Sequence, residues 1–68
     1  MSTIHITLNG QTLELPYGAT LADAARASGV QPPFAAAVNL QFVPRTQYAL
    51  TPLKTGDQVE LISPVTGG

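Results

Sequence analysis

The chain has 68 residues, of which 44% are hydrophobic and only 10% charged, and it contains no cysteine. This length allows one small domain, and the absence of cysteine excludes disulfides, thiolate nucleophiles and cysteine metal sites. The formal net charge is −1 and the three cations are scattered along the chain, which argues against a nucleic-acid partner. No apolar run approaches the about 20 residues that span a bilayer, and the first residues form no apolar signal core, so we expect a cytoplasmic protein with no membrane partner.

The first 16 residues predict a β-hairpin. From Thr3 to Asn9 apolar and polar residues alternate, which is typical of a strand with one buried face. Asn9-Gly10 is the strongest short hairpin signal, because both residues tolerate a positive φ. Alternation resumes from Thr12 to Leu15, and Pro16 removes a backbone donor where the strand is expected to end.

A helix is predicted from Thr20 to Ser28. Thr20 is placed to cap its N-terminus, and Asp23 stands three residues later, where it can return the hydrogen bond and favour the positive end of the helix dipole. Gly29 follows as the residue expected in the left-handed region at the C-terminal end. The apolar face of this helix is mostly alanine, so it can approach a sheet closely.

The second half of the chain predicts three strands and one irregular segment. Gln31-Pro32-Pro33 forms a linker, and the apolar run from Phe34 to Asn39 favours a strand buried on both faces. Gln41-Phe42-Val43 predicts a very short strand. No period holds from Arg45 to Thr55, where we expect three side chains to cover an open side of the core: Tyr48, Leu50 and Leu53.

The last predicted strand runs from Gln58 to Ile62, with Val59 and Leu61 inward. The economical fold for this order is α+β, a mixed sheet with one main helix packed across it and the first and last strands parallel in the middle. This is the ubiquitin-like β-grasp arrangement. We expect a single domain over residues 1–68, with residues 64–68 as a flexible C-terminal tail.

Four motifs, read together, point to a known family. They are Ala37-Val38-Asn39, Val43-Pro44-Arg45, Gly56-Asp57-Gln58-Val59-Glu60-Leu61 and Gly67-Gly68. In this order and length the chain resembles the ThiS family, the sulfur carriers of thiamine biosynthesis. The Val-Asn and Val-Pro-Arg motifs separate this family from the related molybdopterin carriers (MoaD), whereas the last two motifs are common to both. Pro64 departs from the expected pattern.

The resemblance implies a chemistry at Gly68. An E1-like adenylating enzyme (ThiF) would use ATP and Mg²⁺ to form a glycyl adenylate there, and sulfur from a cysteine desulfurase would convert it to a thiocarboxylate for thiazole synthase (ThiG). The chain itself would bind no cofactor and would be a co-substrate, not an enzyme. Glycine suits the last two positions because it lacks Cβ and bends freely. The residues that would enter a partner's active site are Val65, Thr66, Gly67 and Gly68.

Other polar and aromatic residues carry weaker signals. His5 has no second ligand within sequence reach, and Asp57 and Glu60 fit a turn and a solvated strand better than a carboxylate pair. Arg45 suits a partner contact and a turn cap about equally. The candidates for an exposed apolar docking patch are Phe42, Tyr48 and Ile62, against the alternative that most of them are core.

Three other functions remain open at this point. A MoaD-like carrier would end in the same thiocarboxylate, a ubiquitin-like modifier would join lysines through Gly68, and a plain binding module would have an inert tail. A deletion strain that is rescued by thiazole would separate the ThiS-like carrier from a MoaD-like carrier. Isopeptide-linked Gly-Gly remnants on other proteins would indicate a modifier, and full activity without Gly67-Gly68 would indicate a binding module with an inert tail.

Overall fold

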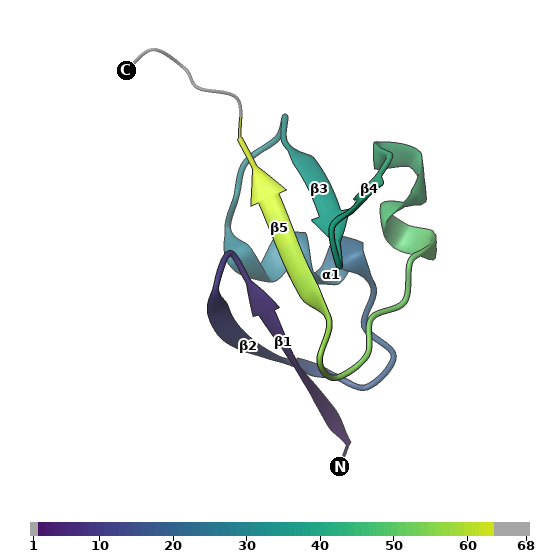
Figure 1. The fold of residues 1–68 in the computed structure, drawn as a ribbon. Coiled ribbons are helices and arrows are strands. Elements are labelled where there is room, and N and C mark those ends of the chain that lie inside the picture. The colour runs from purple at the N-terminus through teal and green to yellow at the C-terminus, as the bar shows by residue number, and fades with distance from the viewer. Residues whose placement is uncertain (1, 64–68) are drawn as a thin grey trace.

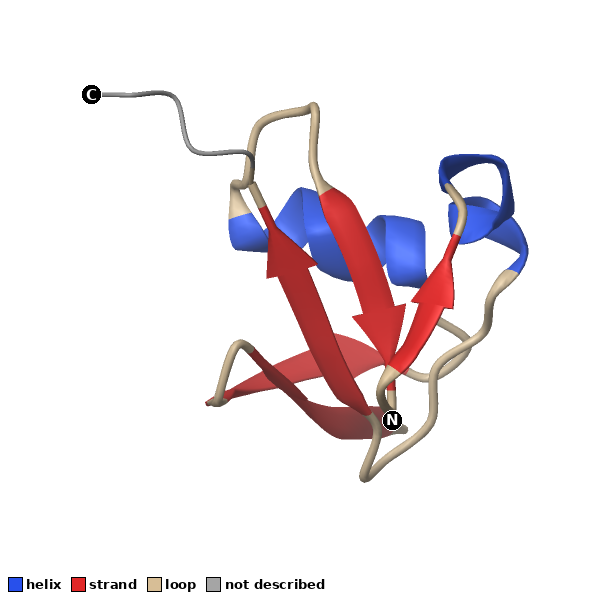
Figure 2. Ribbon diagram, turned by 45° about the horizontal axis from the view of Figure 1, so that its top comes forward, coloured by secondary structure: helices blue, strands red, loops and turns tan. Residues whose placement is uncertain are grey.

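The computed structural model describes residues 2–63, so Met1 and the predicted tail of residues 64–68 lie outside the described part. It contains a five-stranded sheet in the order β2-β1-β5-β3-β4, with one α-helix lying across one face (Figures 1 and 2). The predicted α+β arrangement is confirmed. The elements in chain order are β1 (Thr3–Leu8), β2 (Gln11–Pro16), α1 (Leu21–Ser28), β3 (Ala35–Val38), β4 (Gln41–Val43), the 3-10 helix η1 (Arg45–Leu50) and β5 (Gln58–Ile62).

The β1–β2 hairpin closes as its sequence predicts. Asn9 and Gly10 have φ values of 52° and 85°, the two positive angles of a type I′ turn, whose twist matches that of the flanking strands. The register places Leu8 opposite Gln11. As a result Ile4 and Ile6 are buried beneath the helix while His5 between them is exposed.

Helix α1 is fixed at both ends by local hydrogen bonds. Asp23 N–H donates to the Thr20 hydroxyl oxygen (3.4 Å), and Thr20 N–H donates to the Asp23 carboxylate (2.9 Å), which completes a capping box. The hydrogen bond from Thr20 N–H is the main cause that holds the pKa of Asp23 below its ordinary value, and Arg26 adds to it. Gly29 ends the helix in the left-handed region with φ 79°.

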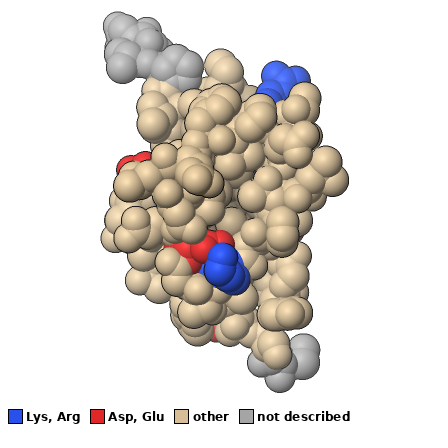
Figure 3. Space-filling view, turned by 45° about the vertical axis from the view of Figure 1, so that its right-hand side comes forward, with Lys and Arg blue, Asp and Glu red and all other residues tan. Residues whose placement is uncertain are grey.

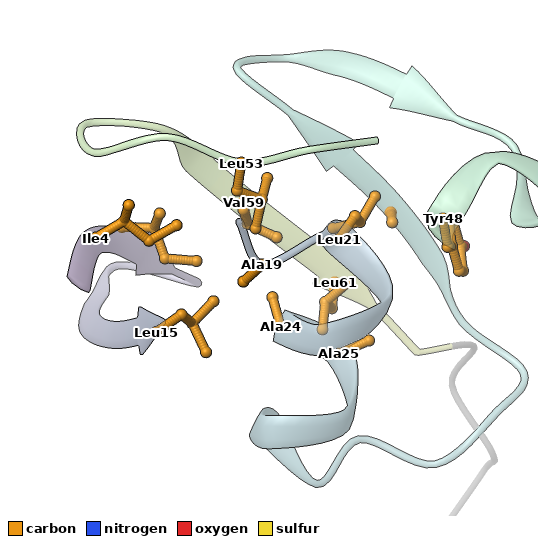
Figure 4. Packing of buried hydrophobic residues seen from close by; sticks show 12 residues of the cluster. Ile4, Leu15, Ala19, Leu21, Ala24, Ala25, Tyr48, Leu53, Val59 and Leu61 are labelled. Atoms are coloured by element: carbon orange, nitrogen blue, oxygen red, sulfur yellow. The ribbon is translucent and has the colours of Figure 1, made fainter. Parts of the chain in front are cut away.

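The core lies between α1 and the covered face of the sheet (Figure 4). Leu21 and Ala24 of the helix are fully buried, and they face apolar side chains from four strands. Small alanine side chains let the helix approach the sheet closely, as the sequence indicated. The buried side chains contributed by the strands are Ile4, Ile6, Leu15, Ala36, Val59 and Leu61.

Strand β5 occupies the centre of the sheet (Figure 1). It runs parallel to β1, with Leu8 opposite Val59, and antiparallel to β3, with Ala35 opposite Ile62. The parallel pairing of the first and last strands confirms the prediction. The chain therefore passes to its C-terminal residues from a strand that has a neighbour on each side.

Two predictions for the second half are wrong. The strand predicted from Phe34 to Asn39 is shorter, and of its four residues only Ala36 is fully buried, because the helix covers one face of the sheet and leaves the other open. Leu50 does not cover the core, since 71% of it is exposed.

The irregular segment covers the core with Tyr48 and Leu53 instead. Leu53 N–H donates to the Ala19 carbonyl, and Leu21 N–H donates to that of Thr51, both at 2.9 Å. These two bonds fix the segment over the start of the helix. They pair residues that are 34 and 30 positions apart, which no periodicity along the chain could indicate.

No helix within residues 2–63 is long and apolar enough to cross a membrane.

Candidate functional site

The end of β5 is held by a side chain as well as by its neighbouring strand. Ile62 is the last strand residue, and Ser63 is the last residue that the structure describes. Leu61 N–H donates to Asn9 Oδ1 (3.0 Å), and Asn9 Nδ2 donates to the Leu61 carbonyl (3.2 Å). On the other edge, β3 pairs with β5 as far as Ile62. Five residues separate this fixed point from Gly68.

The face of the sheet opposite α1, which we call the open face, carries an apolar strip. Ala35 and Ala37 of β3 lie between Ile62 of β5 and Phe42 of β4, because Ala35 pairs with Ile62 and Ala37 pairs with Phe42. Ile62 is 62% exposed and Phe42 is 70% exposed. The two small alanines separate these larger side chains, and Ala37 also pairs with Glu60, whose exposed side chain borders the strip. Two of the predicted docking residues thus share one surface.

Charged groups are sparse on the side of the molecule formed by β4 and η1, next to the apolar strip. Figure 3, which brings the side of β4 and η1 forward, shows a surface made almost wholly of residues other than Lys, Arg, Asp and Glu. A neutral surface of this kind costs little desolvation when a partner covers it.

Tyr48 is not part of an exposed docking patch, and this prediction is wrong. The residue is 9% exposed, its ring stacks on that of Phe34 with centroids 5.5 Å apart, and its hydroxyl donates to the Phe34 carbonyl (3.2 Å). A buried aromatic hydroxyl needs such a partner. The alternative that Tyr48 belongs to the core therefore holds.

Arg45 is exposed at the start of η1, three residues after Phe42. It lines a shallow cavity of about 240 Å³ together with Pro32, Pro33, Phe34 and Tyr48. The structure thus places Phe42 and Ile62 on one face of the sheet, and Arg45 lines this cavity. Val65, Thr66, Gly67 and Gly68 lie outside the described residues.

Asp57 is buried at the start of β5, with 4% of its surface exposed. Its carboxylate accepts hydrogen bonds from Lys54 N–H (2.9 Å) and Asn39 Nδ2 (3.1 Å), and Lys54 Nζ lies 3.6 Å away. Burial alone would raise the pKa of Asp57, but these donors outweigh it and hold the pKa below its ordinary value of 3.8. The carboxylate is thus a structural anion that shapes the turn before β5.

The other acidic and histidine side chains form no catalytic pair in the described structure. Glu60 is exposed on the open face whereas Asp57 is buried, so the turn-and-strand interpretation of these two residues holds. His5 Nε2 lies 3.7 Å from Glu14 Oε2 across β1 and β2, and both side chains are more than half exposed. Within residues 2–63 no three His, Asp or Glu side chains gather as metal ligands would.

Two residues beside the site were not singled out by sequence reasoning. The sequence predicts Asn9 only as a turn residue and carries no signal for Leu40. Leu40 lies at the tip of the β3–β4 turn with φ 70° and is 84% exposed. A leucine in the left-handed region costs about 1 kcal/mol, so its position is not explained by local preference. The signal for Asn9 was its place directly after the strand that pairs with β5.

The sheet order, the single helix and the central C-terminal strand define a ubiquitin-like β-grasp protein. The crystal structure of thiamine biosynthesis protein ThiS from Geobacter metallireducens has the same fold, with a TM-score of 0.78 and 22% sequence identity over 96% of this chain and 100% of that one. No curated protein matches the chain significantly.

The model of the ThiS family matches residues 5–68, nearly the full length, and the chain belongs to this family. The resemblance indicated by the four sequence motifs is confirmed. A role as a sulfur carrier in thiamine biosynthesis follows from family membership.

Proposed function

We propose that this protein carries sulfur as a thiocarboxylate at Gly68 and delivers it to a thiazole synthase (ThiG). The observation that carries the proposal is the family match, which extends through the final Gly67-Gly68. The protein is a co-substrate in this scheme. The reacting group is its own carboxylate, and the acids, bases and metal ions belong to the partner enzymes.

The chemistry begins with activation, because a carboxylate is a poor electrophile. The Gly68 carboxylate attacks the α-phosphate of Mg²⁺-bound ATP on a ThiF-like enzyme, releasing pyrophosphate and forming the glycyl adenylate. A persulfide supplied by a cysteine desulfurase displaces AMP. This leaves Gly68 joined to the sulfur donor through an acyl disulfide. A second thiol attacks the donor's own sulfur, forms a disulfide with it and releases the thiocarboxylate, whose sulfur is the nucleophile for thiazole formation.

The fold supplies reach and docking for this chemistry. The five residues after Ser63 extend about 17 Å when fully stretched, at about 3.4 Å per residue, enough to enter a buried site while the domain stays outside. Phe42 and Ile62 on the open face are the proposed apolar contacts to the partner. Arg45, exposed near η1, is proposed as a separate polar contact.

The test of the proposed function is the intact mass of the protein purified from cells that contain its activating enzyme. We expect a gain of about 16 mass units, the replacement of oxygen by sulfur, localised to Gly68 by fragmentation. An unmodified tail under these conditions would contradict the proposal. Growth of a deletion strain rescued by thiazole distinguishes this carrier from a molybdopterin carrier, and Gly-Gly remnants on lysines of other proteins would instead indicate a modifier.

A charge placed on the open face should weaken docking without harming the fold. Phe42→Glu is expected to raise the KM of the activating enzyme for this protein about tenfold or more, because a carboxylate would be desolvated against the partner's apolar surface. The matched control is Tyr17→Glu, since Tyr17 is also largely exposed but follows β2 at the other edge of the sheet. Steady-state adenylation assays measure KM for both variants, and circular dichroism checks their fold. Equal KM values in the two variants would show that the open face does not take part in docking.

A further inference from the structure

We propose that Asn9 is a positioning residue for the C-terminal tail: its side-chain amide holds the end of β5 in the sheet, so that the tail starts from a fixed point beside the open face. This inference rests on the proposed function, because it concerns how Gly68 is presented to the activating enzyme. The observations that carry it are the hydrogen bonds between Asn9 and Leu61.

The pairing between β1 and β5 stops before β5 does. The last backbone bond on this edge runs from Asn9 N–H to the Val59 carbonyl (2.9 Å). In a continued parallel ladder, Leu61 N–H would donate to the carbonyl of residue 9, and the Leu61 carbonyl would accept from the N–H of residue 11. The chain turns away at Gly10, and Gln11 pairs with Leu8 in the hairpin, so the backbone does not continue beside Leu61.

The side chain of Asn9 replaces both missing partners. Its Oδ1 accepts from Leu61 N–H at 3.0 Å, and its Nδ2 donates to the Leu61 carbonyl at 3.2 Å. The amide therefore adds one further rung to the ladder, up to the residue before Ile62. Without it, the final residues of β5 would be paired on the β3 side alone.

Asparagine meets two demands at this position. The type I′ turn needs a residue that tolerates φ 52°, which glycine, asparagine and aspartate do. Of these, only asparagine offers both the acceptor for Leu61 N–H and the donor for the Leu61 carbonyl. Aspartate would place a carboxylate oxygen against that carbonyl, and glycine would leave both Leu61 groups without this partner.

The consequence for function concerns Ile62 and the residues that follow. Ile62 belongs to the apolar strip of the open face and directly follows the residue that Asn9 holds. If the end of β5 detaches, Ile62 leaves the docking surface and the free tail lengthens, so the effective concentration of Gly68 in the partner's site falls. Because misplacement by about 1 Å can cost about a hundredfold in rate, a fixed starting point for the tail is expected to matter.

The experiment compares Asn9→Gly with Asn39→Gly. Asn39 is a matched control because it also has φ 52° and also bonds β5 through its side chain, with Oδ1 accepting from Gln58 N–H (2.9 Å). It acts at the start of β5, whereas Asn9 acts at the end. Glycine adopts φ 52° without strain, so each variant removes side-chain hydrogen bonds and adds the same backbone freedom. For Asn39→Gly the lost bonds include the one from Asn39 Nδ2 to the Asp57 carboxylate (3.1 Å), so the two variants are compared at an equal folded fraction.

The two variants are measured by amide hydrogen exchange and by adenylation kinetics. For Asn9→Gly we expect the Leu61 amide to exchange at least about tenfold faster relative to that of Val59, and kcat/KM for adenylation to fall about tenfold. For Asn39→Gly we expect faster exchange at Gln58 and a change of less than about twofold in kcat/KM at an equal folded fraction.

Three outcomes would overturn the positioning role. Equal losses of kcat/KM in the two variants would reduce Asn9 to a general contributor to stability. An unchanged Leu61 exchange rate in Asn9→Gly would show that the amide does not hold the strand. If the unaltered protein is not adenylated at all, the proposed function fails, and the exchange data then report separately on whether the Asn9 contact holds β5.

Discussion

A chain that ends at Thr66, with Gly67 and Gly68 removed, is expected to lose adenylation by at least about a thousandfold. Its terminal carboxylate would stand about 7 Å short of the position that Gly68 reaches, since each extended residue spans about 3.4 Å. A displacement of this size places the nucleophile outside reacting distance of the α-phosphate. The assay is ATP-dependent pyrophosphate release with the ThiF-like enzyme.

The fold should not change on this truncation, because the core cluster is formed by residues between Ile4 and Leu61. We therefore expect the Tm of the truncated chain to match that of the full chain. Gly68→Ala is the informative companion variant, since it keeps the length and adds only Cβ. We expect Gly68→Ala to lose adenylation by about tenfold to a hundredfold, less than the truncated chain. This smaller loss would measure how narrow the partner's channel is, whereas the truncation measures the reach of the tail. Full adenylation of the truncated chain would favour an inert tail.

Asp57→Ala is expected to have the largest effect on stability among single changes at polar residues of the described structure. It removes the buried carboxylate that accepts hydrogen bonds from Lys54 N–H and Asn39 Nδ2. The expected cost is about 2–3 kcal/mol in the free energy of unfolding, because two hydrogen bonds to a charged group are lost. A domain of this size has only about 3–10 kcal/mol in total. Urea denaturation measures the difference.

Glu60→Ala is the control for this change, because Glu60 is another acid of the same segment but is exposed. We expect it to alter the free energy of unfolding by no more than about 0.5 kcal/mol. Similar destabilisation by both variants would mean that the charge balance of the segment matters more than the Asp57 hydrogen bonds.

The same carboxylate should make stability depend on pH. The pKa of Asp57 is lower in the folded protein than its ordinary value of 3.8, so its contribution is present above about pH 4 and is lost as pH falls through the folded value. The free energy of unfolding should therefore decline below about pH 4 and decline less steeply in Asp57→Ala. The pKa of Asp23 is lowered too, but Asp23 is present in both proteins, so the difference between their pH profiles isolates Asp57.

The local elements were predictable because their signals are local. Alternation in β1 and β5, the Asn9-Gly10 turn and the Thr20–Asp23 capping box depend on residues at most a few positions apart. Each of these features is present in the structure as predicted. The sulfur-carrier role was also accessible, because the motifs that carry the resemblance, including the terminal Gly67-Gly68, are contiguous in the sequence.

The surface around the site was only half predictable. Phe42 and Ile62 are exposed, which agrees with the docking interpretation and not with the alternative that they belong to the core. For Ile62 the alternation of β5 was the signal. Tyr48 lies in an aperiodic segment, and its burial depends on stacking against Phe34 and on a hydrogen bond to the Phe34 carbonyl. Leu50, only two residues away, remains outside the core.

By itself, then, the sequence determined most of the elements, the β-grasp order and the family, since hydrophobic period, turn chemistry and motifs are all properties of neighbouring residues. Only the tertiary structure decided which side chains hold β5 in place. Asn9 and Leu61 are 52 residues apart, and the buried carboxylate of Asp57 meets Asn39 across 18 residues. Such contacts form because β5 pairs with β1 on one side and with β3 on the other. The turns that follow β1 and β3 therefore lie next to β5, although they are distant from it in the sequence.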